Sequence, residues 1–256
     1  MKKINQLFLI TFFLIFIFAP ANAEKVKYIG QELSGEIKLT YETKVILPLG
    51  MWEVSAMTKK HQYPVWMETA FVQIDSSKIK AILIVGYPKE PVINGWYEKS
   101  DTPCDDYDGQ QSNFHEKKIK TSSGFIMSGS CSSIYANTNV DRSLWDKWDI
   151  MRDTHEFIAK KNVKVYPSAL IHIESNWFTK ENAVEITYAY NPEFNNITSK
   201  RGHWTDSEWS KYKIDDFPTK KDFMNEVIYS HKLAIDNSIN GLKKRKPIDL
   251  SYYDFR

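Results

Sequence analysis

Histidine and glutamate stand two residues apart in the segment 170–174, at His172 and Glu174. Alternate side chains of a β-strand point to the same side, so this spacing places an imidazole and a carboxylate together on one face. Such a pair can ligate a metal ion or share a proton. The same spacing also suits an ordinary polar face that meets solvent or a neighbouring strand. The pair is therefore a candidate polar site, with both interpretations open.

Glutamates on predicted strands could supply the paired carboxylates of a glycoside hydrolase, at Glu68, Glu174 and Glu185. That chemistry requires two carboxyl groups at a defined separation in space and leaves no short motif in a sequence. Nothing in the spacing of the three selects two of them. We therefore assign no catalytic residue from this pattern.

Motifs of several enzyme classes are absent from the sequence. Neither glycine-rich phosphate-binding motif occurs, and the serine elbow G-x-S-x-G is missing too. Ser-x-x-Lys occurs at 77–80 and 210–213, but without the Ser-Asp-Asn and Lys-Thr-Gly partners of penicillin-recognising enzymes. Cys131 in Gly-Ser-Cys-Ser would act as a nucleophile only as a free thiol beside a general base.

Metal-ligand patterns are incomplete, so we expect no metal and no cofactor. His155 and His231 interrupt apolar helical stripes and would have to join His172 to form a three-histidine site. The segment 104–109 is similar to the start of an EF-hand loop, but Cys104 and His115 stand where oxygen ligands belong. Whether the acidic loop 105–109 binds Ca²⁺ through Asp106 and Asp108 stays open.

Residues 1–23 have the pattern of a secretory signal peptide. Two lysines precede an apolar block at 7–18, and Ala21-Asn22-Ala23 offers small residues where a signal peptidase cuts. The block is too short to span a bilayer, which takes roughly 20 apolar residues. We therefore expect cleavage after Ala23, no integral membrane segment afterwards, and a periplasmic or secreted location.

The two cysteines, Cys104 and Cys131, both follow the expected cleavage site. An even number of cysteines in an exported chain predicts a disulfide. Closing a loop of about 27 residues contributes roughly 3 to 4 kcal/mol in the chain-entropy account. We expect this bond to restrain a segment that contains few apolar residues.

The charge balance excludes one class of partner. The chain has 34 basic and 32 acidic residues, and removal of Lys2 and Lys3 with the signal peptide leaves 32 of each. Proteins that bind nucleic acid need a basic surface, so no nucleic-acid partner is expected. The dense basic run 243–246 follows a helical pattern, where cations stabilise a helix C-terminus.

Hydrophobic periodicity predicts one α+β domain over residues 24–256, with a mainly antiparallel sheet of about 7–9 strands and two long helices packed on one face. The most distinct hairpin pairs 65–74 with 79–87 through a polar link at 75–78, and a second pairs 169–174 with 184–190. Further strands are expected at 37–41, 45–49, 52–57 and 125–135. The helices are expected from Asp141 to about Lys161 and from a cap at Thr219 to Leu242, and the aromatic tail after Pro247 is expected to pack back on the domain.

These observations favour an exported, non-enzymatic protein that binds a small ligand, a glycan or another component of a bacterial envelope. A hydrolase with dispersed acidic or histidine catalysts is the alternative from another class. A scaffolding component that docks through an exposed helix face is the third possibility. A site where several titratable groups converge would favour the hydrolase, and an aromatic or apolar surface would favour the binder.

Overall fold

The computed structural model describes residues 23–40, 42–60, 65–90, 96–97, 125–126, 128–137, 148–163, 166–179, 183–200, 202, 206–210, 212–244 and 246–255. The expected signal peptide, apart from Ala23, lies outside the described residues. So do Cys104, His115 and the acidic segment 105–109. The disulfide, the cleavage site and the calcium question therefore stay predictions.

Seven strands form the main sheet, and every neighbouring pair in it is antiparallel. Their order is β10-β11-β12-β7-β6-β5-β2. This confirms the α+β class with a mainly antiparallel sheet. The strands are β2 (Glu32–Leu33), β5 (Trp52–Lys60), β6 (Trp66–Asp75), β7 (Lys78–Pro88), β10 (Ser128–Asn137), β11 (Leu170–Thr179) and β12 (Ala183–Tyr190).

The hairpin β6–β7 is present, but its turn is tighter than the sequence pattern indicated. Asp75 pairs with Lys78, which leaves Ser76 and Ser77 as a two-residue turn with φ of 51° and 61°. Two consecutive positive φ values match the twist of the flanking strands, although glycine or asparagine is the usual choice there. The central strand β7 is buried on both faces over most of its length, as its apolar run predicts.

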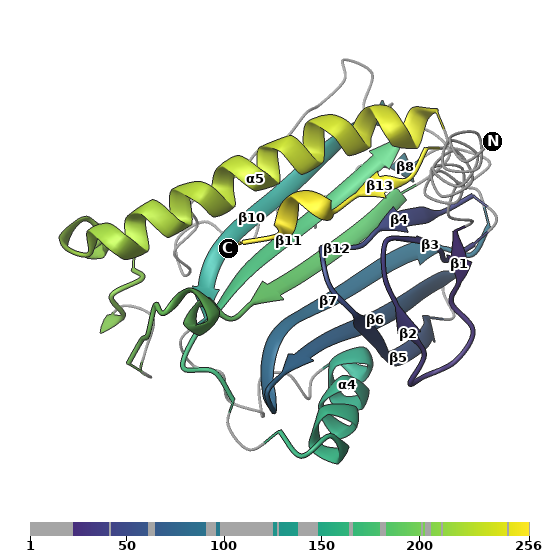
Figure 1. The fold of residues 1–256 in the computed structure, drawn as a ribbon. Helices are drawn as coiled ribbons and strands as arrows, with labels where there is room; N and C mark the ends of the chain where they lie inside the picture. Colours follow the sequence, from purple (N-terminus) through teal and green to yellow (C-terminus); the bar gives the residue numbers. More distant parts are fainter. Residues whose placement is uncertain are drawn as a thin grey trace, which may run out of the picture.

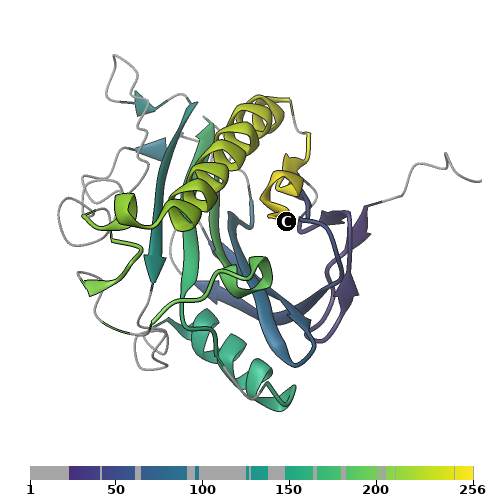
Figure 2. The same cartoon turned by 60° about the vertical axis from the view of Figure 1, so that its left-hand side comes forward.

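Helix α5 (Pro218–Lys243) packs on one face of the main sheet, against β10 and β11. Figures 1 and 2 show it lying along the concave side of the curled sheet, together with the C-terminal segment. Its buried positions recur at three and four residues, as expected for an amphipathic helix. They are Lys220, Phe223, Met224, Val227, His231, Ala234, Ile235, Ser238 and Leu242.

Helix α4 (Asp149–Lys160) packs on the opposite face, against β5 and β6, so the expectation that both helices share one face is wrong. On β7, Leu83 and Val85 belong to the core under α5, whereas Ile82 and Ile84 belong to the core under α4. Because successive strand residues face opposite sides, these two clusters lie on the two faces of one sheet. The sheet is thus covered by one helix on each side.

The helix ends differ from those expected. Trp148 has extended backbone angles directly before α4 and is 57% exposed, so it interrupts the expected helix and does not join the apolar stripe. The expected start at Asp141 lies outside the described residues. Helix α4 ends at Lys160, close to the asparagine that predicted its end. Asn162 has a φ of 57°, the left-handed conformation common just after a helix. Helix α5 begins at Pro218, so Thr219 lies within its first turn and is not the cap. Proline suits that position because its N–H would have no partner there.

The C-terminal tail packs back into the core, as its aromatic residues predicted. The Tyr188 hydroxyl donates to the Tyr253 carbonyl at 3.0 Å, and the Tyr190 hydroxyl donates to the Phe255 carbonyl at 3.0 Å. His231 Nδ1 lies 2.8 Å from the Tyr253 hydroxyl oxygen. The tail therefore links α5 to the centre of the sheet, through β13 (Ile248–Asp249) and the 3₁₀ turn η4 (Ser251–Tyr253).

Smaller elements complete the fold. The strand β13 extends a four-stranded sheet in the order β1-β3-β4-β13, and β8 pairs with β9. Asn191 ends the second hairpin, and its side chain accepts a hydrogen bond from the Glu193 backbone N–H at 3.0 Å. The remaining elements are β1 (Glu24–Lys25), β3 (Glu36–Lys38), β4 (Lys44–Ile46), β8 (Trp96–Tyr97), β9 (Phe125–Ile126), η1 (Pro192–Asn195) and η3 (Ile214–Asp216).

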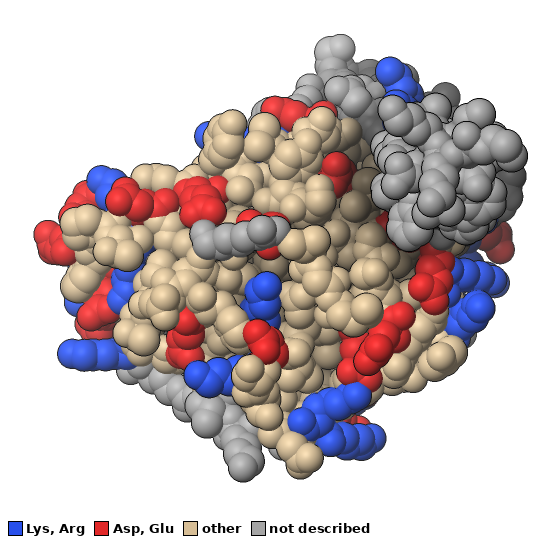
Figure 3. Space-filling view, in the orientation of Figure 1, with Lys and Arg blue, Asp and Glu red and all other residues tan. Residues whose placement is uncertain are grey.

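Acidic and basic side chains are interspersed on the face of the molecule that carries α5 (Figure 3). Over the described residues, no helix is both long enough and apolar enough to cross a membrane.

Candidate functional site

The sheet face that carries α4 also collects charged side chains from four strands. Glu68 on β6 pairs with Gly86 on β7, and Gly86 pairs with Glu185 on β12. Paired residues point to the same side, and neighbouring strands lie about 4.8 Å apart. The Cα atoms of the two glutamates are therefore about 10 Å apart, with only a glycine between them.

Glu174 on β11 lies in the next row of the same face, opposite Thr187 of β12. Lys60 near the end of β5 and Tyr135 on β10 complete the group. We call these five residues the carboxylate cluster: Lys60, Glu68, Tyr135, Glu174 and Glu185. The three acids named from the sequence as dispersed candidates are thus brought together by strand pairing.

Glu68 is buried but well partnered. Its Oε2 accepts a hydrogen bond from the Thr58 hydroxyl at 3.0 Å, and its Oε1 forms an ion pair with the Lys60 ammonium group. A buried carboxylate is tolerated when such partners replace water. Lys60 is thereby engaged with Glu68 and keeps part of its side chain in solvent.

Glu185 is the unusual member of the carboxylate cluster. Its side chain is half-buried, and it forms no hydrogen bond or ion pair within the described ranges. Burial raises the pKa of its carboxyl group, Lys60 opposes this rise, and the negative charges of Glu68 and Glu174 add to it. A carboxyl group in this setting binds a proton more readily than an ordinary glutamate does.

Tyr135 joins the two residues that the sequence singled out. Its hydroxyl donates to Glu174 Oε1 at 2.5 Å, while its ring stacks on the His172 imidazole with centroids 5.0 Å apart and an interplanar angle of 10°. His172 and Glu174 do share a face, as their spacing predicts. His172 is only 6% exposed, however, and burial lowers its pKa to about 4. It is therefore a neutral, packed imidazole at neutral pH.

Gly86 leaves room for an aromatic side chain beside the carboxylates. A Cβ atom at this position would lie 2.7 Å from Trp66 Nε1 and 3.2 Å from Glu185 Cβ. The indole edge of Trp66 therefore lies against the backbone of β7, next to Glu185. The sequence reasoning named neither residue, and the sole signal for Gly86 was a glycine inside an apolar strand, which marks a close approach.

We expect Gly86→Ala to lower the free energy of unfolding by about 1 to 3 kcal/mol, because the new methyl group overlaps the Trp66 indole. Urea unfolding followed by circular dichroism measures this difference. Gly202→Ala is the matched control, since no heavy atom lies within 4 Å of the Cβ position there. Equal losses in the two variants would mean that the indole does not occupy the space above Gly86.

We expect Glu185→Gln to raise the melting temperature at pH 7. The pKa of Glu185 is raised in the folded state, so its contribution to stability is present below the unfolded pKa and is lost as pH rises through the folded pKa. Glutamine cannot ionise and avoids that loss, so the variant and the wild type should converge near pH 4. Glu156→Gln on the exposed side of α4 is the control and should change little. A lower melting temperature for Glu185→Gln at pH 7 would contradict this account.

The three histidines considered as a metal site do not come together. His231 lies under α5 beside Tyr253, on the opposite side of the sheet from His172. His155 packs edge-on against Tyr166, with ring centroids 5.6 Å apart. Across the described ranges, no group of three histidine, cysteine, aspartate or glutamate side chains could hold a metal ion.

Cys131 lies on β10, opposite Asn176 of β11. Asn176 in turn pairs with Glu185, so the backbone of Cys131 lies in the same row of the sheet as Glu185. Cys104 lies outside the described residues, and the disulfide between the two cysteines stays a prediction.

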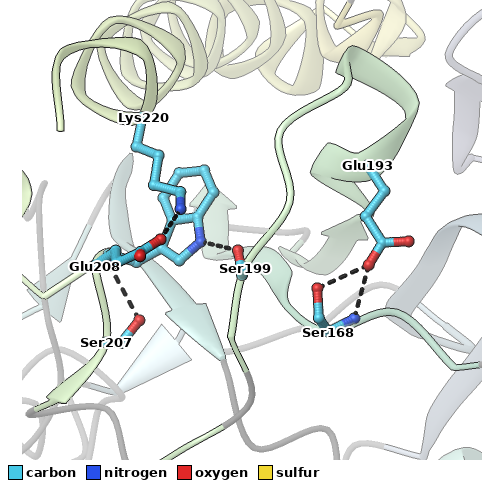
Figure 4. A network of polar contacts seen from close by, with 7 residues as sticks. Ser168, Glu193, Ser199, Ser207, Glu208 and Lys220 are labelled. Carbon is cyan, nitrogen blue, oxygen red and sulfur yellow. Dashed lines mark hydrogen bonds and ion pairs between the residues drawn. The ribbon is translucent and has the colours of Figure 1, made fainter.

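A second polar cluster lies where α5 begins (Figure 4). Lys220 is buried there and forms an ion pair with Glu208, and its Nζ lies 5.5 Å from the centroid of the Trp209 ring. The Trp209 indole N–H donates to the Ser199 hydroxyl at 2.5 Å. These contacts pair the groups of the cluster with one another, so the cluster fixes the loop before α5.

Neighbouring hydrogen bonds in the same view anchor the start of β11. Glu193 Oε1 accepts from the Ser168 backbone N–H at 3.0 Å and from the Ser168 hydroxyl at 2.7 Å (Figure 4). They tie the segment that precedes β11 to the 3₁₀ turn that follows β12. The carboxylate cluster is accordingly the candidate site.

Comparisons with known proteins do not assign this chain to a family. No protein-family model matches the sequence, and no curated protein matches it at a significant level. A crystal structure of a protein from Streptomyces coelicolor, described as a proposed transcriptional regulator, is weakly similar in fold. It is 12% identical with a TM-score of 0.29, and the match covers 56% of this chain and 86% of that one.

Proposed function

We propose that this protein is exported and binds a small hydroxyl-rich ligand, such as a glycan, at the carboxylate cluster without catalysing a reaction. The observation that carries the proposal is the state of Glu185. Its side chain is half-buried, desolvation raises the pKa of its carboxyl group, and no side chain of the described residues forms a hydrogen bond with it. A bound ligand that donates hydrogen bonds would supply the missing partner.

The surroundings of Glu185 support a sugar-like ligand. Trp66 and Tyr135 are both partly exposed on this face, and flat aromatic rings pack against the apolar faces of sugars while carboxylates accept hydrogen bonds from hydroxyl groups. Asn176, opposite Glu185, adds an amide that can both donate and accept. Aromatic and polar groups of this kind are typical of small-ligand sites.

Export is part of the proposal and is supported by residues 1–23. The leader pattern, the small residues before Glu24 and the even number of cysteines all suit a periplasmic or secreted protein. A ligand from the envelope, free or attached to a larger component, then becomes the natural partner. Mass spectrometry of the non-reduced exported protein would test this: a mass starting at Glu24 and two hydrogens below that of the dithiol supports it, and full-length reduced protein contradicts it.

Binding is tested by isothermal titration of residues 24–256 with two probes, the tetramer of N-acetylglucosamine and the tetramer of glucosamine. We expect heat of binding with at least one of them, and its loss in Trp66→Ala. Tyr229→Ala is the matched control, because Tyr229 is exposed on α5, which covers the opposite face of the sheet. Absence of binding by both tetramers would contradict the proposed function for this ligand class.

A hydrolase is the second candidate, favoured by the contrast between two acids. Burial raises the pKa of Glu185, whereas Glu68 accepts a hydrogen bond from Thr58 and forms an ion pair with Lys60, and two acids in such different surroundings are typical of acid and base roles. Chromatography of either tetramer after incubation with the protein separates the two functions. Shorter products that disappear with Glu185→Gln would establish the hydrolase, and an unchanged tetramer that still gives heat of binding would support the binder.

A further inference from the structure

We propose that the side chain of Asn196 is the acceptor of an N-linked glycan. Asn196, Ile197 and Thr198 form the tripeptide N-x-T, the pattern that is glycosylated on surface loops of exported proteins. No other asparagine of the sequence is followed by serine or threonine two positions later. Such tripeptides often occur by chance, so the inference stands on how the fold presents this one. It goes beyond the proposed ligand binding and concerns a different part of the surface.

The backbone holds the tripeptide in a defined turn. Asn196 directly follows the 3₁₀ turn η1 and has a left-handed conformation, with φ of 58° and ψ of 24°. Asparagine adopts this conformation more readily than most residues do. The Asn196 N–H donates to the Glu193 carbonyl at 3.0 Å, and the Ile197 N–H donates to the Pro192 carbonyl at 3.1 Å. The tripeptide therefore begins at a fixed turn of the folded chain.

The side chains of the tripeptide divide between the core and the solvent. Ile197 is only 8% exposed and packs into the core, whereas Asn196 before it and Thr198 after it are both exposed. The motif requires the asparagine amide and the hydroxyl two residues later, so a transferase must reach both groups. The buried isoleucine anchors the segment between them and leaves both groups accessible in the folded protein.

The amide of Asn196 is not used by the fold. Neither this amide nor the Thr198 hydroxyl forms a hydrogen bond with any residue that the structure describes. The preceding asparagine differs, because Asn195 is half-buried and its Oδ1 lies 2.5 Å from the Tyr190 hydroxyl oxygen. Of the two neighbouring asparagines, Asn195 is thus committed to the fold, and Asn196 can be modified without the loss of an internal contact.

Both ends of the segment are tied to the body of the protein (Figure 4). Glu193 accepts two hydrogen bonds from Ser168, and Ser199 accepts one from the Trp209 indole. The turn also lies away from the carboxylate cluster, because Tyr190 at the end of β12 is already five residues, or about 17 Å, from Glu185. A glycan on Asn196 should therefore leave the carboxylate cluster accessible.

The reaction needs a sugar donor whose C1 carries a diphosphate linked to a lipid or to a nucleoside. The amide nitrogen of Asn196 forms a bond to C1 of the sugar, and the bond between C1 and the diphosphate oxygen breaks. The diphosphate leaves with the electron pair of that bond, and the amide nitrogen gives up one proton to a base of the transferase. No oxidant or reductant takes part, and this chain supplies only the acceptor.

Two reactions on the folded protein test the inference and distinguish the two donors. In one, the protein is incubated with a membrane oligosaccharyltransferase and a lipid-linked oligosaccharide. In the other, it is incubated with a soluble N-glycosyltransferase and a nucleoside diphosphate sugar. We expect peptide mass spectrometry to find a glycan on Asn196 in at least one reaction, and an amidase that releases N-linked glycans to leave aspartate there. An unmodified Asn196 in both reactions would overturn the inference.

Four variants connect the modification to this tripeptide. Thr198→Ala should abolish it although Asn196 is still present, Thr198→Ser should retain it, and Asn196→Asp should abolish it. Asn162→Asp is the matched control, because Asn162 is also an exposed asparagine in the left-handed conformation, with φ of 57°, but a lysine stands two positions later. It should be modified like the wild type. A glycan that persists at position 196 in Thr198→Ala would contradict the inference, and circular dichroism checks that each variant is folded.

Discussion

Acidification from pH 7 to pH 4 is expected to lower the free energy of unfolding by about 3 kcal/mol through His172 alone. The pKa of this buried imidazole is about 4 in the folded protein, against 6.5 for an ordinary histidine. Between these two pH values the unfolded chain binds a proton that the folded chain does not. Stability from the neutral ring is therefore fully present above about pH 6.5 and is lost as pH falls toward 4.

The variant His172→Phe measures this contribution. Phenylalanine keeps a flat ring against Tyr135 but cannot bind a proton. Urea unfolding of both proteins from pH 7 to pH 4 should therefore show a smaller loss of stability in the variant, whatever other groups titrate in both. Parallel curves over this range would show that His172 is not held neutral by burial.

Glu208→Gln is expected to cost about 2 to 4 kcal/mol of folding free energy, because it leaves the Lys220 ammonium group buried without a counter-ion. Lys220 lies in the first turn of α5, where the positive end of the helix dipole makes a lone cation still less favourable. Its contacts with the rings of Trp209 and Phe217, at 5.5 and 5.6 Å, offset only part of that cost.

Adding Lys220→Met to this variant should restore most of the lost stability, because methionine fills similar space without a charge. Asp206→Asn is the control, since its ion pair with Lys213 is exposed and long, at 3.9 Å, and such pairs contribute little. Chemical unfolding of the wild type, Glu208→Gln, Lys220→Met and the variant with both changes forms a double-mutant cycle. If Glu208→Gln and Asp206→Asn cost equally little, the buried ion pair does not anchor α5.

The local elements of this fold could be read from the sequence because their signals are local. The alternation in 65–74 and 79–87 predicts two strands, and the polar residues between them predict the turn. Trp148 shows the limit of such signals: it fits a helical stripe in sequence, but the chain takes an extended conformation there and the side chain is exposed. Helix periodicity fixes which side of a helix is apolar and says nothing of which sheet face that side will cover.

The candidate site shows the same division. Alternation placed His172 and Glu174 on one face, and strand composition named Glu68, Glu174 and Glu185 as acids that could act together. The sequence could not show three contacts, because each of them joins different strands. Tyr135 stacks on His172, Lys60 reaches Glu68, and Trp66 lies over Gly86.

The amino-acid sequence alone determined the class of this fold, the faces of its strands and the residues whose side chains could take part in binding or catalysis. The tertiary structure decided the rest: strand order and register placed Glu68 and Glu185 on either side of Gly86, and burial raised the pKa of the Glu185 carboxyl group. The reason is physical. Side-chain alternation follows from the backbone of one strand, whereas register and desolvation depend on segments that are distant in the chain and meet only when the whole sheet has formed.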